Sequence, residues 1–146
     1  MVSDPGMPAA TLSLGAGKVV LVVEDDTRVR RLAVHHLAAL GFRVLEAGDG
    51  AAALAELRAH PEVDVLYSDL VMPGPLSGLD LARQAQRLYP GLRIVLTSGY
   101  SAELAREEEA VAGLPILRKP YRLGDLVHTL REVLSQPAPG PPTASA

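Results

Sequence analysis

Short apolar runs alternate strictly with longer segments of helical periodicity along this chain. The runs are rich in Val and Leu, carry few charges and are too short for helices, as in strands buried on both faces of a parallel sheet. They occupy residues 18–23, 42–46, 63–69, 92–97 and 115–118. The segments with helical spacing are residues 27–40, 50–59, 78–88, 102–111 and 123–134. This alternation predicts an α/β protein, a (βα)5 chain with a five-stranded parallel sheet.

The first predicted helix has typical boundary residues at both ends. Asp26 or Thr27 can cap its N-terminus, and Gly41 can end it. Its apolar residues recur at helical spacing, at Val29, Leu32, Leu37 and Leu40. This spacing is typical of a helix with one apolar face.

Length and composition suggest one folded domain with two extensions. The 146 residues suffice for a core, which must be built from Leu, Val and Ala because aromatic residues make up only 3% of the chain. Residues 1–17 are rich in Gly, Pro, Ala and Ser, which predicts a flexible leader. Residues 136–146 hold four prolines and no charge, which predicts a disordered tail. The folded body is then residues 18–135.

Charge and cysteine content argue against several classes of function. The net charge of −3 with both signs mixed gives no basic patch, so we expect no direct binding to nucleic acid. The longest apolar runs have the length of strands, so we expect no membrane contact. The absence of cysteine excludes disulfides and thiolate metal sites, and agrees with a cytoplasmic protein.

Chemically active side chains follow four of the predicted strands. Asp69 ends the third strand, because the Met-Pro-Gly-Pro sequence three residues later cannot continue it. The other groups at strand ends are the acids Glu24, Asp25 and Asp26, the hydroxyls of Thr97 and Ser98, and the amine of Lys119. The carboxyl ends of parallel strands share one edge of the sheet, where ligands bind in open α/β folds. We therefore expect these groups to converge.

Such a cluster suits phosphoryl transfer. Carboxylates without Cys or His nearby form a hard oxygen site of the kind that Mg²⁺ prefers. The charge of Lys119 could neutralise a bound phosphoryl group, and Ser98 or Thr97 could donate a hydrogen bond to it. Asp69 could then attack phosphorus and form an acyl phosphate. The residues alone also allow a simpler interpretation, in which the acids cap helices or turns and Lys119 is a solvated amine.

Four short motifs resemble the successive signatures of response-regulator receiver domains. They are residues 22–26 (VVEDD), 68–73 (SDLVMP), 97–100 (TSGY) and 119–121 (KPY). Their order and intervals resemble the family over about residues 18–134. The resemblance implies a flavodoxin-like sheet with strand order 2-1-3-4-5. It also implies an aspartate that, with Mg²⁺, accepts a phosphoryl group from a phosphohistidine on a partner.

The resemblance assigns the acidic residues to positions in this site. Asp69 falls at the phosphoacceptor position and is also a metal ligand. Glu24 and Asp25 fall on the acidic pair, with Asp25 as a direct metal ligand and Glu24 acting through water. The main-chain carbonyl of Val71 is implied as a further ligand.

The resemblance also assigns the amine and the hydroxyl. Lys119 falls at the phosphate-binding lysine, and Pro120 after it is expected to follow a cis peptide bond. Counting along the fourth strand from Pro90 places Ser98 at the position of the switch hydroxyl. Thr97 is the alternative.

Two departures from the family pattern concern switching and hydrolysis. Ile116 stands three residues before Lys119, where an aromatic switch residue is common, so Tyr100 or Tyr121 would have to replace it. Val71 and Tyr100 occupy positions that flank the phosphoryl group. Neither can activate a water molecule, so we expect slow self-dephosphorylation.

The implied partner is a histidine kinase or phosphotransfer domain that carries a phosphohistidine. Receivers resemble one another in docking such partners on the first helix, where His35 and His36 lie; we interpret these histidines as solvated rather than catalytic. A weak homodimer is left open. The chain is either a stand-alone regulator or the receiver of a hybrid sensor histidine kinase, and the tail and the TSGY motif favour the second.

Two rival functions use the same residues. A Mg²⁺-dependent phosphohydrolase with an Asp nucleophile would need an acid two residues after Asp69, where Val71 stands. An interaction module independent of phosphorylation would not need the acids, yet all are present. A receiver catalyses its own phosphorylation and slow dephosphorylation without being a turnover enzyme.

Overall fold

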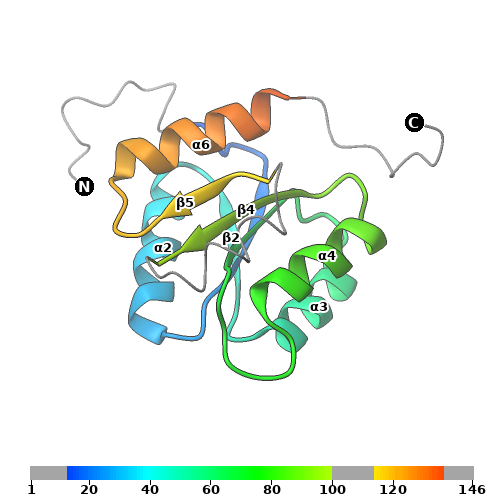
Figure 1. The fold of residues 1–146 in the computed structure, drawn as a ribbon. Coiled ribbons are helices and arrows are strands. Elements are labelled where there is room, and N and C mark those ends of the chain that lie inside the picture. The colour runs from blue at the N-terminus through cyan, green and yellow to red at the C-terminus, as the bar shows by residue number, and fades with distance from the viewer. Residues whose placement is uncertain (1–12, 100–113, 137–146) are drawn as a thin grey trace.

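The computed structural model describes residues 13–99 and 114–136, which form a parallel sheet between two layers of helices (Figure 1). The strands are β1 (Val19–Val23), β2 (Arg43–Ala47), β3 (Val65–Asp69), β4 (Arg93–Ser98) and β5 (Ile116–Arg118). The helices of the described residues are α2 (Thr27–Ala39), α3 (Gly50–Ala59), α4 (Gly78–Leu88) and α6 (Leu123–Ser135). The helix predicted at residues 102–111 lies outside the described residues.

The strand order is β2-β1-β3-β4-β5, and every neighbouring pair is parallel. This arrangement confirms the predicted α/β class and the flavodoxin-like order. Helices cover both faces of the sheet, and β1 at its centre is accordingly entirely apolar, with all five of its residues buried.

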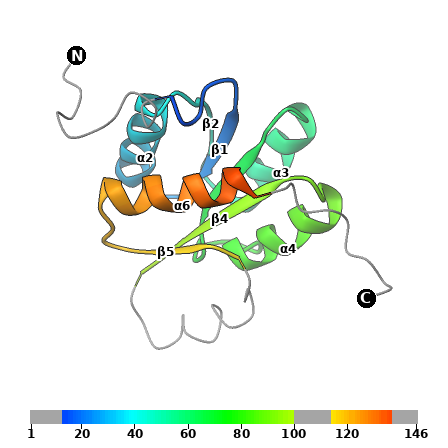
Figure 2. The same ribbon diagram turned by 90° about the horizontal axis from the view of Figure 1, so that it is seen from above.

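Each face of the sheet has its own core. Helices α2 and α6 cover one face and α3 and α4 the other, as the two orthogonal views show (Figures 1 and 2). Leu37 of α2 and Leu130 of α6 are fully buried in the first core, and Leu57 and Leu81 are buried in the second. Each buried leucine contributes about 2 kcal/mol through removal of its side chain from water.

The first helix begins and ends where its boundary residues predict. Asp26 is the N-cap and accepts hydrogen bonds from the two N–H groups that follow Thr27, and Gly41 after the helix has a positive φ of 98°. The predicted apolar face is only partly buried. Leu37 and Leu40 lie in the core, whereas the side chains earlier in the helix, Val29 and Leu32, are 40% and 57% exposed. They line a cleft instead of packing against the sheet.

The first described residues pack on the domain. Residues 13–17, which we predicted as part of the leader, form a turn in which the Gly15 N–H donates to the Leu40 carbonyl. The rest of the predicted leader, and all of the predicted tail beyond Gln136, lie outside the described residues. Within residues 13–99 and 114–136, no helix is long and apolar enough to cross a membrane.

Candidate functional site

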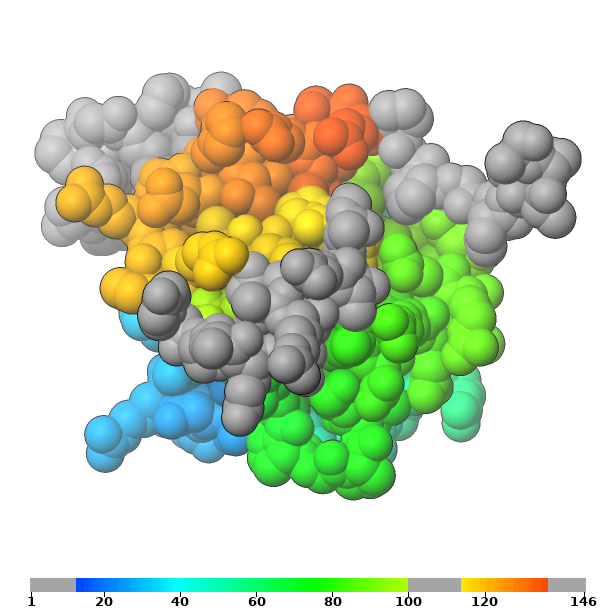
Figure 3. Space-filling view, in the orientation of Figure 1, coloured from blue at the N-terminus to red at the C-terminus, as the bar shows by residue number. Residues whose placement is uncertain are grey.

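The carboxyl ends of β1, β3 and β5 bring four of the predicted site residues together. Carboxylate oxygens of Glu24, Asp25 and Asp69 all lie within 4.8 Å of one another. The Lys119 Nζ donates to Glu24 Oε1 at 3.1 Å and to Asp69 Oδ2 at 3.3 Å. In the space-filling view the start of α2 and the loop after β3 lie next to each other along this edge (Figure 3). The expected convergence of the acids and the amine is therefore present.

Glu24 is held from several directions at the end of β1. Its side chain is buried, with Oε1 accepting from Lys119 and Oε2 accepting from the Asp26 N–H at 3.0 Å. Arg30 of α2 donates through Nη1 to the Glu24 carbonyl at 2.8 Å and through Nε to Glu46 Oε1 at 3.1 Å. Both Glu24 carboxylate oxygens are thus engaged within the protein. Sequence reasoning missed Arg30, because an arginine on an exposed helix carries no signal for such a contact.

Asp25 is the exposed member of the acid cluster. Partial burial, followed by a hydrogen bond to Glu24 and the charge of Glu24, raises the pKa of Asp25 above its usual value. Burial alone would lower the pKa of Lys119, but the charges and hydrogen bonds of Asp69 and Glu24 outweigh it and raise that pKa. The cluster thus combines three carboxylates with the ammonium group of Lys119, which hydrogen-bonds to two of them. The remaining negative charge and the all-oxygen donor set fit Mg²⁺.

Asp69 is fixed by the close approach of β3 to the start of α4. A Cβ atom on Gly78, the first residue of α4, would lie 2.0 Å from the Asp69 carbonyl oxygen, so only glycine fits there. Beyond the strand, the Leu70 N–H donates to the Thr97 carbonyl of β4 at 2.8 Å. Val71 is 48% exposed, and its N–H makes a long contact of 3.5 Å with Asp69 Oδ1. The Gly78 contact is a second feature that the sequence did not reveal.

The two candidate hydroxyls follow one another at the end of β4. Thr97 stands opposite Asp69 in the β3–β4 register, and Ser98 is the next residue. Both are buried, and strand alternation directs their side chains to opposite faces. Thr97 lines the cleft on the α2 side, while the Ser98 hydroxyl donates to the Gly99 carbonyl at 3.0 Å and the Ser98 carbonyl accepts from the Lys119 N–H at 2.7 Å. Tyr100 lies outside the described residues.

β5 and the segment after it hold the two residues that bear on an aromatic switch, Ile116 and Tyr121. Ile116 stands opposite Leu96 and packs against the core on the α3 and α4 side. Tyr121 lies on the other side of the sheet, where its hydroxyl is hydrogen-bonded to that of Tyr67. The Lys119–Pro120 peptide bond is cis, as expected.

A cleft of about 280 Å³ lies beside the acidic cluster. Its walls come from α2, from β1, β3 and β4, and from the segment after β5. Val29, Leu32 and His36 line it from α2, and Lys119 and Tyr121 line it from the opposite side. Burial, and then the charge of the neighbouring histidine, lower the pKa of His36. No sequence pattern predicted this cleft.

Comparison with known proteins identifies the family. The sequence model described as "Response regulator receiver domain" matches residues 20–131. The chain is 35% identical over 118 residues to the response regulator receiver protein CpdR of Brucella abortus, covering 80% of this chain and 97% of that protein. It is also 35% identical over 125 residues to the sensor kinase CckA of the same species, covering 84% of this chain but only 13% of that protein.

Solved structures agree with this assignment. The chemotaxis protein CheY4 of Vibrio cholerae is 30% identical and superimposes with a TM-score of 0.70, covering 81% of this chain and 99% of that one. A response regulator receiver protein from Sinorhizobium medicae is 28% identical with a TM-score of 0.72, covering 84% of this chain and 97% of that one. The chain therefore belongs to the response regulator receiver domain family and is a receiver domain of a two-component system.

Proposed function

We propose that Asp69 is the phosphoacceptor of this receiver domain and that the residues around it bind Mg²⁺ during phosphoryl transfer. The observation that carries the proposal is the cluster itself. Asp69 lies in one cluster with two further carboxylates and with the ammonium group of Lys119, whose Nζ is 3.3 Å from Asp69 Oδ2. Asp25 is the exposed acid and serves as a direct ligand, whereas Glu24, whose oxygens are engaged, acts through water. The Val71 carbonyl and Asp69 complete the protein ligands.

The chain's own residues position both partners of the transfer. An oxygen of Asp69 forms a bond to phosphorus while the bond between phosphorus and the donor's imidazole nitrogen breaks, and that nitrogen is reprotonated. Bound Mg²⁺ would supply further positive charge beside the phosphoryl oxygens. Lys119, already beside Asp69, transfers its hydrogen bond from the carboxylate to a phosphoryl oxygen.

Switching follows from the charge added at Asp69. A phosphoryl group brings up to two negative charges and three acceptor oxygens. The Ser98 hydroxyl, which now donates to the Gly99 carbonyl, turns toward one of these oxygens, and the loops after β3 and β4 move with it. We select Ser98 on the count along β4 from Pro90, and Thr97, which stands opposite Asp69 in the register, stays the alternative.

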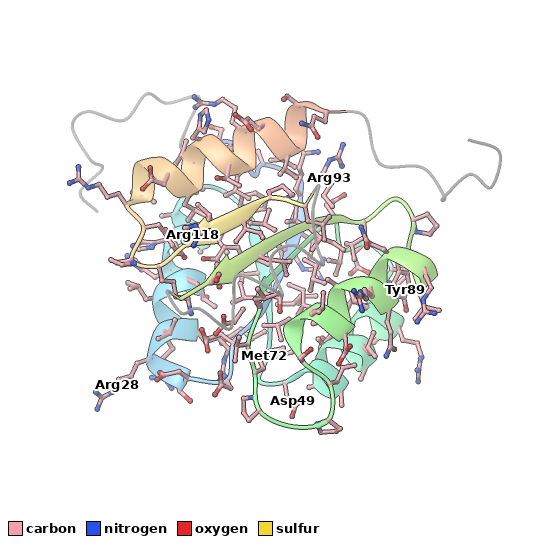
Figure 4. The ribbon with its side chains drawn as sticks, viewed as in Figure 1. Arg28, Asp49, Met72, Tyr89, Arg93 and Arg118 are labelled. Atoms are coloured by element: carbon pink, nitrogen blue, oxygen red, sulfur yellow. The ribbon has the colours of Figure 1, made fainter. Side chains whose placement is uncertain are left out.

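The phosphodonor is a histidine kinase or phosphotransfer domain that docks on α2. The exposed side of this helix presents apolar Val29 and Leu32, with basic Arg28 and Arg31 beside them, and α2 contains no acidic residue. Arg28 points away from the molecule at the start of the helix (Figure 4). The phosphoryl transfer takes place in the cytoplasm. The domain is either a stand-alone regulator or the receiver of a larger kinase.

The test is incubation with Mg²⁺ and a small phosphodonor, or with beryllofluoride, followed by intact-mass measurement. We expect one phosphoryl group per chain in the wild type and none in Asp69→Asn. Asp49→Asn is the matched control, because it removes one acid but keeps the N-cap of α3. Catalytic release of phosphate would instead indicate a phosphohydrolase. Absence of any adduct would indicate an interaction module and refute the proposal.

A further inference from the structure

Two side-chain contacts join β3 to the segment after β5, although β3 and β5 are not neighbours in the sheet. β4 lies between them in the sheet. At the edge of the sheet, Lys119 reaches Asp69. Beneath it, the hydroxyl of Tyr121, two residues after Lys119, is hydrogen-bonded to the hydroxyl of Tyr67, two residues before Asp69. The tyrosine pair and the ion pair thus link the same two segments.

The cleft makes the tyrosine pair important for the position of this segment. Lys119, Pro120 and Tyr121 all line the cleft of about 280 Å³, so side chains of α2 do not fill the space on that side of them. Tyr67 is 4% exposed and is fixed in the core on β3. The hydrogen bond to the buried Tyr67 hydroxyl therefore constrains Tyr121 on a side where close packing is missing.

Within residues 13–99 and 114–136, backbone hydrogen bonds hold this segment at both of its ends but not at Pro120 or Tyr121 between them. The Lys119 N–H donates to the Ser98 carbonyl at 2.7 Å, and Arg122 begins α6 through a capping interaction with Asp125. Between these points, the hydrogen bond of Tyr121 to Tyr67 ties the segment to β3. Burial, and then the charge of Glu24, raise the pKa of Tyr121 to about 12, so its hydroxyl keeps its proton at neutral pH.

We propose that Tyr67 and Tyr121 are positioning residues for Lys119, whose hydroxyl pair holds the segment after β5 against β3 and keeps the ammonium group beside Asp69. The inference rests on the proposed roles of Asp69 and Lys119. It gives this chain a second link across β4 that does not depend on the charge of Asp69. The link lies on the α2 and α6 side of the sheet, opposite Ile116.

The first experiment compares phosphorylation with stability in Tyr67→Phe, Tyr121→Phe and the double variant. Loss of one hydrogen bond should slow phosphorylation by a small donor at saturating Mg²⁺ about fivefold. The double variant should be no slower than either single one, because the same bond is lost. Its thermal unfolding should stay close to that of the wild type, since no hydroxyl is left unpaired. Tyr89→Phe, at the far end of α4, is the matched control.

The second experiment observes Lys119 directly. The chain contains only two lysines, Lys18 and Lys119, so lysine labelled with ¹³C at Cε gives two signals. In the double phenylalanine variant, relaxation should show greater motion of Lys119 and unchanged motion of Lys18. This measurement needs no phosphodonor, so it still tests the inference if Asp69 is not phosphorylated. If the double variant is phosphorylated at the wild-type rate and its Lys119 relaxation is unchanged, the inference is overturned.

Discussion

Replacing Asp25 with asparagine should stabilise the protein in the absence of metal, although Asp25 belongs to the proposed Mg²⁺ site. Its carboxylate lies within 4.8 Å of those of Glu24 and Asp69, and Lys119 hydrogen-bonds to the other two acids. Folding therefore brings the Asp25 carboxylate close to like charges, and this repulsion is relieved when the chain unfolds. The substitution Asp25→Asn would keep the size of the side chain and remove the repulsion.

The distance and the exposure of Asp25 set the size of the effect. Two unit charges 4.8 Å apart repel by about 0.9 kcal/mol in the dielectric of water, which is the appropriate limit for an exposed group. Asp25 faces two such charges, and the Lys119 ammonium beside them offsets about one, so we expect the free energy of unfolding to rise by about 1 kcal/mol at low ionic strength. For a domain of this size the midpoint of thermal unfolding rises by about 4 °C.

The effect of Asp25→Asn should depend on pH with a defined sign. Burial, and then the hydrogen bond and charge of Glu24, raise the pKa of Asp25 in the folded protein above the ordinary value of 3.8. The folded state therefore holds the Asp25 proton more tightly than the unfolded state does. The cost of ionising Asp25 is present in full above the folded pKa, decreases as the pH falls through it, and is absent below 3.8. The advantage of the variant should shrink in the same way.

Urea unfolding followed by circular dichroism measures the free energy of unfolding of both proteins, once with EDTA and once with Mg²⁺. Mg²⁺ should stabilise the wild type through binding to the folded state and should stabilise Asp25→Asn much less. Asp49→Asn is the control, because it removes an acid remote from the cluster and keeps a helix cap. A variant less stable than the wild type in EDTA, or equal stabilisation of both proteins by Mg²⁺, would refute the reasoning.

Three further predictions concern the supports of the site and its hydrolysis. Gly78→Ala should lower the free energy of unfolding by about 1 to 3 kcal/mol, because its Cβ would collide with the Asp69 carbonyl; Gly124→Ala, where nothing lies within 4 Å, should not destabilise in the same urea titration. Arg93→Met removes hydrogen bonds to two carbonyls at the end of α6 (Figure 4), so amide exchange there should accelerate while exchange in α4 stays unchanged. Phospho-Asp69 should decay slowly, and several-fold faster in Val71→Asn; equal decay rates would contradict the assignment of Val71 as an obstacle to water.

The fold could be predicted because its signals are local. Runs of Val and Leu, helical spacing and boundary residues such as Asp26 and Gly41 each act within a few residues of the chain. The strand order came from the family resemblance rather than from these patterns. The buried side of α2 was predicted less well. Periodicity identifies the apolar residues Val29 and Leu32 but cannot show whether another element packs against them, and here a cleft lies in that place.

The convergence of the acids with Lys119 could also be predicted, because it needs only parallel strands that end at one edge. Glu24 and Lys119 are 95 positions apart, yet each directly follows a strand of the same sheet. The selection of Ser98 over Thr97 was harder, since neighbouring residues on a strand face opposite sides and a shift of one residue exchanges them. The β3–β4 register places Thr97 opposite Asp69, and the selection of Ser98 stays a prediction.

The contacts that support the site depend on side chains meeting across elements, and the sequence carries no local signal for such meetings. Tyr67 and Tyr121 are 54 positions apart and lie on segments separated by β4. Gly78 looks like an ordinary first residue of a helix, and only the backbone behind it shows why a side chain cannot fit. In the proposed mechanism, residues at strand ends carry the chemistry, whereas less conspicuous residues keep the reacting groups in place. Substitutions that look conservative in the sequence, Tyr67→Phe among them, are for this reason the most informative ones to make.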